Sequence, residues 1–186
     1  MIAIQEAQAD SNSNQVEEIA KLIDFKYHNF DATSSSHIDE NKQLGNGIIS
    51  KYPISEHSHG LFLNPNIEAE RQGKIIKTHD KGFGKCFINF GEKSVEAAAL
   101  HLIPFQTFNI DLSSEKGREI LSSVTQKIGV SNKYSLVMGD FNIDSPTISE
   151  YLPKFFNLSG VKEITLDEPT IPSGKQYDHV IYRALI

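Results

Sequence analysis

The segment GDFNID at residues 139–144 holds the side chains best suited to chemistry. Asp140 and Asn142 follow the apolar run SLVM, and residues two apart in an extended segment project to the same side. A carboxylate and an amide would then lie together where a buried strand ends, a usual position for sites in α/β sheets. Gly139 would let the backbone turn there. The alternative is an ordinary Asx turn, because Asp and Asn also bond to nearby backbone groups.

Other candidate residues are distributed along the chain. Glu6 leaves the apolar start IAIQEA, and a carboxylate at a strand end often holds Mg²⁺, with water and substrate phosphate completing the ligand set. His101 follows AAAL and could donate to a phosphate oxygen. Asp178 and His179 are adjacent in QYDHVIYR, so one points into the sheet face and the other away. Taken singly, each also has a structural interpretation.

His57 and His59 lie two residues apart in SEHSHG. If this stretch is extended, both imidazoles share a face and could chelate a transition metal. The alternative is a solvated loop, since the sequence shows no cysteine or clustered further ligand beside them.

Composition limits the class of protein. The chain has 186 residues, a net charge of −6 and one cysteine, Cys86, which excludes an intramolecular disulfide framework. No apolar run approaches the roughly 18 residues that span a bilayer. Met1 is followed by apolar residues without a basic region, which is not typical of a signal peptide. A single folded domain over residues 1–186 is expected, with localisation left open and the cytoplasm as the default.

The charge is unevenly distributed. Residues 1–40 carry a net −6, whereas residues 71–85 carry a net +4. The basic residues of this second stretch are Arg71, Lys74, Lys77, Lys81 and Lys85. Such a stretch could meet a phosphate-bearing ligand, or it could be a solvated lysine-rich loop.

Apolar periodicity predicts alternating strands and helices. Strands are expected at 2–7, 46–54, 85–90, 94–102, 133–142 and 176–186, the last running to the final residue. Helices are expected after Ser13 or Asn14, over 113–129, and after Ser145 as N-cap with Pro146 at the first helical position. The stretches 31–43 and 64–74 are interpreted as loops. This order favours an α/β or α+β fold with a sheet-dominated core.

Five sequence blocks together resemble the endonuclease/exonuclease/phosphatase family, the deoxyribonuclease-I-like and exonuclease-III-like phosphoesterases. They are, in family order, IAIQE, LGNGIISKYPI, AAALHL, VMGDFN and PSGKQYDHVIYR. GDFN is the most specific of them. The resemblance implies a four-layer α/β sandwich and hydrolysis of phosphodiesters with Mg²⁺, or alternatively Mn²⁺.

The resemblance also implies a role for each matching residue. Glu6 matches the glutamate that binds the metal, and Asp140 the aspartate that positions the attacking water. Asn142 matches the asparagine that holds the scissile phosphate or its attacking group. His101 resembles a histidine that contacts phosphate, and Asp178 the aspartate that orients the catalytic histidine. These residue types suit the reaction, since a metal and hydrogen-bond donors must neutralise charge that develops on the phosphate.

The sequence departs from the family pattern at both ends. A strand bearing an asparagine normally precedes the position of Glu6, and a strand with a Ser-Asp-His motif, which supplies the catalytic base, normally follows the position of Asp178. We therefore expect a partial domain lacking these strands, with low solubility and low activity when isolated. A preceding segment could then carry a secretion signal. His179 is a candidate substitute base.

Several functions remain open at this stage. The leading hypothesis is a Mg²⁺-dependent phosphodiesterase, with a nuclease slightly favoured over a lipid or inositol phosphoesterase because of residues 71–85. A non-catalytic module of the same fold is the alternative. A metal-independent phosphatase with Asp140 as nucleophile is a third hypothesis, disfavoured because Asn142 stands where a second aspartate would be needed. The sequence does not indicate an oligomeric state.

Overall fold

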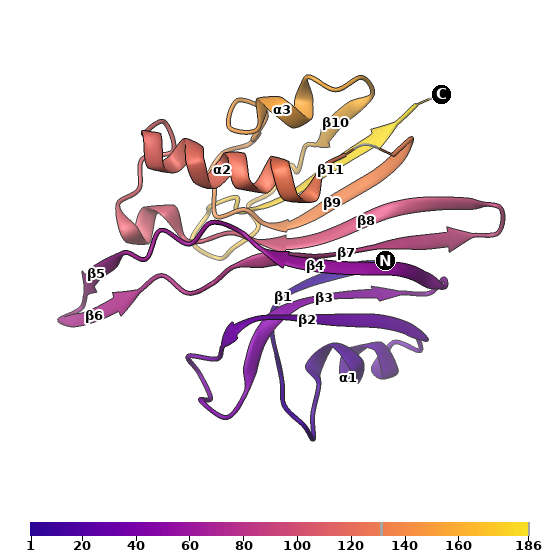
Figure 1. Ribbon diagram of the computed structural model, residues 1–186, viewed down its shortest axis with the longest axis horizontal. Coiled ribbons are helices and arrows are strands. Elements are labelled where there is room, and N and C mark those ends of the chain that lie inside the picture. The colour runs from indigo at the N-terminus through magenta and orange to yellow at the C-terminus, as the bar shows by residue number, and fades with distance from the viewer. Residues whose placement is uncertain (131, 186) are drawn as a thin grey trace.

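Two sheets packed face to face form the body of the protein, with helices on both outer faces (Figure 1). The computed structural model describes residues 1–130 and 132–185. The smaller sheet has the strand order β1-β3-β2, formed by Ile2–Ala9, Gln43–Ser50 and Tyr27–Ser35. Helix α1 (Gln15–Leu22) covers its outer face.

The larger sheet has the order β10-β11-β9-β8-β7-β4. Its strands, in that order, are Val161–Ile164, Asp178–Ala184, Tyr134–Asp140, Lys93–His101, Gly82–Phe90 and Ile54–Leu61. β8 and β9 are parallel, whereas the other neighbouring pairs are antiparallel. Its outer face is covered by α2 (Glu115–Ile128) and α3 (Pro153–Phe156) (Figure 1). The four layers confirm the expected α+β sandwich.

Small side chains allow these layers to pack closely around β8. Ala97 and Ala99 lie between the sheets beside Ile48, Cys86 and Ile88. On the opposite face, Ala98 belongs to the larger hydrophobic core, to which α2 contributes Ile120, Val124 and Ile128. Burying these apolar side chains contributes most of the stabilising free energy.

Most expected elements are present, and their local signals are visible. Asn14 caps α1, since its Oδ1 accepts from the backbone nitrogens of Val16 and Glu17. The expected hairpin is formed by β7 and β8. The last strand, β11, ends at Ala184. It was expected to run to Ile186, which lies outside the described residues.

The prediction of a helix that begins after Ser145 is wrong. The Ser145 hydroxyl donates to the Thr147 carbonyl at 2.6 Å, and Glu163 Oε2 accepts from the backbone nitrogen of Ile148 at 3.0 Å. These bonds hold the segment in an irregular turn, so helix α3 begins only at Pro153.

Two stretches interpreted as loops contain strands. Residues 31–35 belong to β2. Residues 64–74 contain β5 (Glu68–Arg71) and the start of β6 (Lys74–Lys77), which pair only with each other. Gln72 and Gly73, both at positive φ, form a two-residue turn that suits a tight hairpin. A 3₁₀ helix, η1, spans Phe105–Phe108. None of the helices that the structure describes has the length and apolar character needed to cross a bilayer.

Gly139 is required for close contact between β8 and β9 rather than for a turn. Its φ is +151°, and a Cβ there would lie 2.0 Å from the Leu100 carbonyl oxygen. We expect Gly139→Ala to lower the free energy of unfolding by about 3 kcal/mol in urea denaturation. Gly129→Ala is the matched control, because Gly129 also has positive φ but nothing within 4 Å of the added carbon. Its cost should be only about 1–2 kcal/mol, and equal losses for both variants would contradict the steric explanation.

Candidate active site

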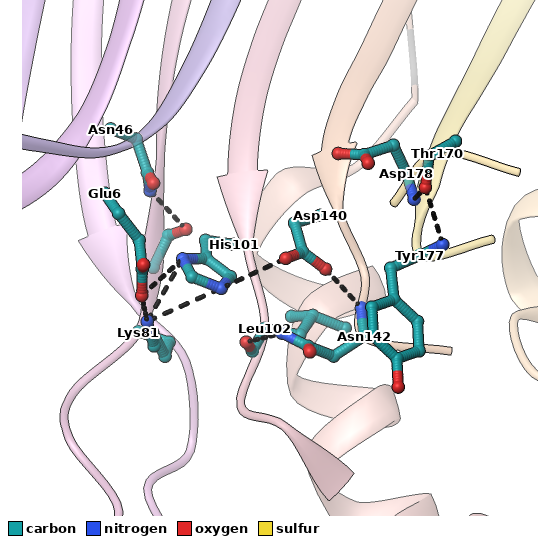
Figure 2. A network of polar contacts seen from close by, with 11 residues as sticks. Glu6, Asn46, Lys81, His101, Leu102, Asp140, Asn142, Thr170, Tyr177 and Asp178 are labelled. Carbon is teal, nitrogen blue, oxygen red and sulfur yellow. Dashed lines mark hydrogen bonds and ion pairs between the residues drawn. The ribbon is translucent and has the colours of Figure 1, made fainter. Parts of the chain in front are cut away.

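Three candidate residues lie in a row across neighbouring strands of the larger sheet. His101 ends β8 and is the register partner of Asp140, which ends the parallel strand β9. Asp140 is in turn the register partner of Asp178, the first residue of β11. The sheet therefore brings an imidazole and two carboxylates to one edge, where Figure 2 shows them with Asn142.

Glu6 reaches this edge from the smaller sheet because β1 contains a bulge. The register with β3 shifts between Ile4 and Ala7, and Glu6 adopts a φ of +56°. Ile4 and Ala7 both pack towards α1. In an unbroken strand Glu6 would share the face of Ile4 and point at the helix, since side chains alternate with period two. The extra residue turns Glu6 towards the larger sheet instead.

Lys81 connects the two sheets at this point. Its Nζ lies 3.0 Å from Glu6 Oε1 and 3.1 Å from His101 Nδ1 (Figure 2). Lys81 is almost completely buried and directly precedes β7, whose Gly82 carbonyl accepts a 2.8 Å hydrogen bond from Asn46 Nδ2 of β3. The ammonium is thus held in a fixed position between the carboxylate and the imidazole.

This arrangement sets the charge of both partners. Burial alone would raise the pKa of Glu6, but the Lys81 ammonium outweighs burial and holds that pKa below its usual value. Burial, followed by the Lys81 charge, lowers the pKa of His101 to about 3. His101 is therefore neutral at physiological pH. Since Nδ1 accepts from Lys81, Nε2 carries the proton, and Nε2 lies 3.5 Å from Asp140 Oδ2.

Asp140 has a pKa raised to about 6. Burial is the main cause, and the negative charges of Asp178 and Glu6 add to it, whereas the Asn142 backbone N–H and Lys81 oppose it. A carboxylate with this pKa is ionised at neutral pH and binds a proton more strongly than an ordinary aspartate. It therefore has the proton affinity of a general base.

Asn142 lies beside Asp140 but not in an extended segment. Its φ is +53°, and its backbone nitrogen donates to Asp140 Oδ1 at 2.7 Å. Its Nδ2 donates to the Leu102 carbonyl at 2.8 Å. The Asx turn and the shared site, treated as alternatives from the sequence, thus occur together, and the turn fixes the amide at the pocket wall.

His179 does not reach the pocket. It is 1% exposed, with Nδ1 2.8 Å from Glu163 Oε1 and Nε2 3.1 Å from the Ile143 carbonyl oxygen. Both ring nitrogens are engaged in the interior, so the hypothesis that His179 substitutes as the base is wrong. Asp178, by contrast, lines the pocket beside Asp140. Its backbone nitrogen donates to Thr170 Oγ1 at 3.1 Å.

The row of side chains faces a cavity of about 550 Å³ between the two sheets and the β5–β6 hairpin. Arg71 and Lys77 of the basic stretch line this cavity together with Lys81, whereas Lys85 pairs with Glu96 elsewhere. The stacked rings of His37 and His79, with centroids 5.4 Å apart, also line it. Neither histidine has a spacing signal in the sequence, and nothing in the sequence distinguishes Lys81 from the other lysines.

The donor atoms at this site fit a hard divalent cation. Mg²⁺ usually takes one or two carboxylates, with water and substrate phosphate as the other ligands. The carboxylates of Glu6 and Asp140 both line the cavity and are such donors. Lys81 already engages Oε1 of Glu6, so a cation would compete with the ammonium or use Oε2.

Comparison with protein families gives a match over nearly the whole chain. The model of the Endonuclease/Exonuclease/phosphatase family matches residues 1–184. Comparison with curated proteins gives no match.

Solved structures with the same fold support this match. An endonuclease/exonuclease/phosphatase from Beutenbergia cavernae DSM 12333 has a TM-score of 0.67 and 14% identity, over 97% of this chain and 54% of the other. A family protein from Leptotrichia buccalis C-1013-b has a TM-score of 0.60 and 14% identity, over 97% and 74%. The human nocturnin catalytic domain with bound sulfate anion has a TM-score of 0.59 and 12% identity, over 97% and 68%. The chain therefore spans about half the length of the first of these proteins.

The raised pKa of Asp140 predicts a pH-dependent gain in stability for Asp140→Asn. The folded state favours the protonated acid, so ionisation of Asp140 costs folding free energy, which is fully present above the folded pKa of about 6 and is lost as the pH falls through 6 towards the ordinary value of 3.8. The variant should be more stable than the wild type by up to about 3 kcal/mol at pH 8 and equally stable near pH 4. Urea denaturation in EDTA at both pH values measures this, and a variant less stable at pH 8 would contradict the assignment.

Lys81→Met should raise the pKa of His101, because one of the two causes of its depression is removed while burial remains. The expected value stays below the ordinary 6.5, and the titration of the ring signals in NMR spectra measures it. Lys77→Met is the matched control, since Lys77 is an exposed lysine at the cavity rim paired with Glu68. A His101 pKa that moves equally in both variants would refute the role of Lys81.

Proposed function

The chain belongs to the endonuclease/exonuclease/phosphatase family, and on this premise we propose that it hydrolyses phosphodiester bonds with Mg²⁺ or Mn²⁺ held at Glu6. The observation that carries the proposal is the meeting of Glu6 from one sheet with His101, Asp140 and Asn142 from the other around one cavity. Carboxylate, amide and neutral imidazole groups suit a reaction in which negative charge accumulates on phosphate oxygens.

The side chains have complementary roles in this proposal. The cation, when bound, would neutralise charge on the phosphate. Asp140 accepts a proton from the attacking water, and Asp178 supports this role because its charge helps to raise the pKa of Asp140. Neutral His101 donates from Nε2 to a phosphate oxygen, and Asn142 positions the phosphate. Lys81 fixes Glu6 and His101 in place before substrate binds.

We propose a nucleic-acid strand as the substrate in preference to a lipid or inositol phosphate. Arg71 and Lys77 on the β5–β6 hairpin bring positive charge to the cavity rim, where the backbone of a polyanion would pass. The net charge of −6 favours contacts confined to this rim over tight nonspecific binding. Sulfate bound to the human nocturnin domain is a tetrahedral anion like phosphate, which is consistent with anion binding in this fold.

A non-catalytic binding module is the second candidate function. It is favoured by the position of His179, which is buried away from Asp178 and cannot act as a histidine base. In that case the cavity would bind phosphodiesters without cleaving them.

Hydrolysis assays distinguish the two functions. We expect cleavage of bis(p-nitrophenyl) phosphate and of a fluorescent single-stranded oligonucleotide in Mg²⁺ or Mn²⁺, and none in EDTA. Asp140→Asn should lower kcat by about 10²-fold or more. Asp167→Asn, which changes an exposed aspartate outside the cavity, serves as the control and should retain full activity. Oligonucleotide binding without turnover in either cation would instead establish the binding module.

A further inference from the structure

A second cluster of metal-ligating side chains lies outside the candidate active site. Asp31 belongs to β2, the edge strand of the smaller sheet, and His57 and His59 belong to β4, the edge strand of the larger sheet. None of the three lines the cavity of Glu6 and Asp140. The cluster therefore joins the two sheets at their shared edge.

The distances within the cluster are close to those of a metal site. His57 Nε2 lies 2.8 Å from Asp31 Oδ1, and His59 Nδ1 lies 3.5 Å from the same oxygen. One ligand atom from each residue lies within 4.8 Å of the other two. Ligand atoms around a tetrahedral Zn²⁺ are about 3.3 Å apart, given bonds of about 2.0–2.1 Å. Small side-chain movements would thus complete the geometry.

A bulge in β4 turns both histidines towards Asp31. The register with β7 shifts between Ser55 and Ser58, and Glu56 adopts a φ of +50°. Ile54 pairs with the inward-facing Ile88, so an unbroken strand would point His57 and His59 outwards. A left-handed glutamate costs about 1–2 kcal/mol. Strain of this kind is typical of positions where a side chain is re-aimed for function.

The carboxylate of Asp31 is buried in a space that a glycine, Gly84 of β7, leaves open. Its side chain is 3% exposed, and a Cβ on Gly84 of β7 would lie 1.8 Å from its Oδ2. Burial raises the pKa of Asp31, although His57 and His59 oppose this.

The geometry points to a transition-metal site of the zinc type, in which Asp31, His57 and His59 hold the ion and tie β2 to β4. Two imidazoles and a carboxylate are a ligand set that first-row transition metals accept readily. The side chains of His57 and His59 are 34% and 62% exposed, so an ion can enter and water can take the remaining position. This site is independent of the proposed hydrolysis.

Metal competition tests the site directly. We expect the protein to withdraw one equivalent of Zn²⁺ from a chromophoric chelator at pH 7.5, and His59→Gln to weaken this binding at least tenfold. Since His59 is exposed, the variant should keep its fold. Asp31→Asn and His57→Gln should weaken it similarly, and Co²⁺ absorption bands should be lost in the same variants. His37→Gln, which removes an exposed imidazole from the cavity of Glu6 and Asp140 instead, should bind Zn²⁺ as the wild type does.

Thermal unfolding provides a second readout. At the same concentration, Zn²⁺ should raise the Tm of the wild type and of Glu6→Gln more than that of His59→Gln, because only an ion bound to the folded state stabilises it. The proposal is overturned if Zn²⁺ does not bind stoichiometrically. It is also overturned if His59→Gln binds normally, or if Glu6→Gln or His37→Gln abolishes binding instead.

Discussion

The contact of the Lys81 ammonium with Glu6 and His101 is the interaction on which the candidate site depends. The two sheets meet through apolar side chains, and a polar group in such an interface must find a partner or pay a desolvation cost. Lys81 resolves this for a carboxylate of one sheet and an imidazole of the other. The same ammonium holds the pKa of Glu6 below its usual value and adds to burial in lowering the pKa of His101, so one buried cation acts on the charge of both groups that it contacts.

Both side-chain clusters arise from the same backbone device. In β1 and in β4, a glutamate in the left-handed region marks a one-residue bulge, and the residues at or after it turn towards the opposite sheet. In β1 the glutamate itself enters the cavity, whereas in β4 the bulge redirects the histidines that follow. The fold thus accepts local backbone strain where an uninterrupted strand would leave polar groups on the wrong face.

Local signals explain why much of the fold could be predicted. The helix caps at Asn14 and Ser114 act through nearby backbone nitrogens, and the apolar run SLVM indicates that a buried strand ends at Asp140. What could not be predicted depends on distant partners. Residues 145–149 form side-chain bonds with one another and with the distant Glu163 instead of the expected helix, and the bulges break the period of two from which strand faces are inferred. Lys81 could not be distinguished from the neighbouring basic residues in the sequence, because only tertiary packing buries it.

The β5–β6 hairpin has a different relation to the fold from every other strand pair described here. Its strands pair with no strand of the smaller or the larger sheet, and it packs on the core through Ala69 and Ile76. Changes at its exposed turn, Gln72 and Gly73, disturb no other strand, while its Arg71 and Lys77 border the cavity. Mutation can therefore reshape this rim during evolution at little cost in folding free energy. The shape and charge of this rim can thus diverge among descendants of this chain while the residues beneath the hairpin stay the same.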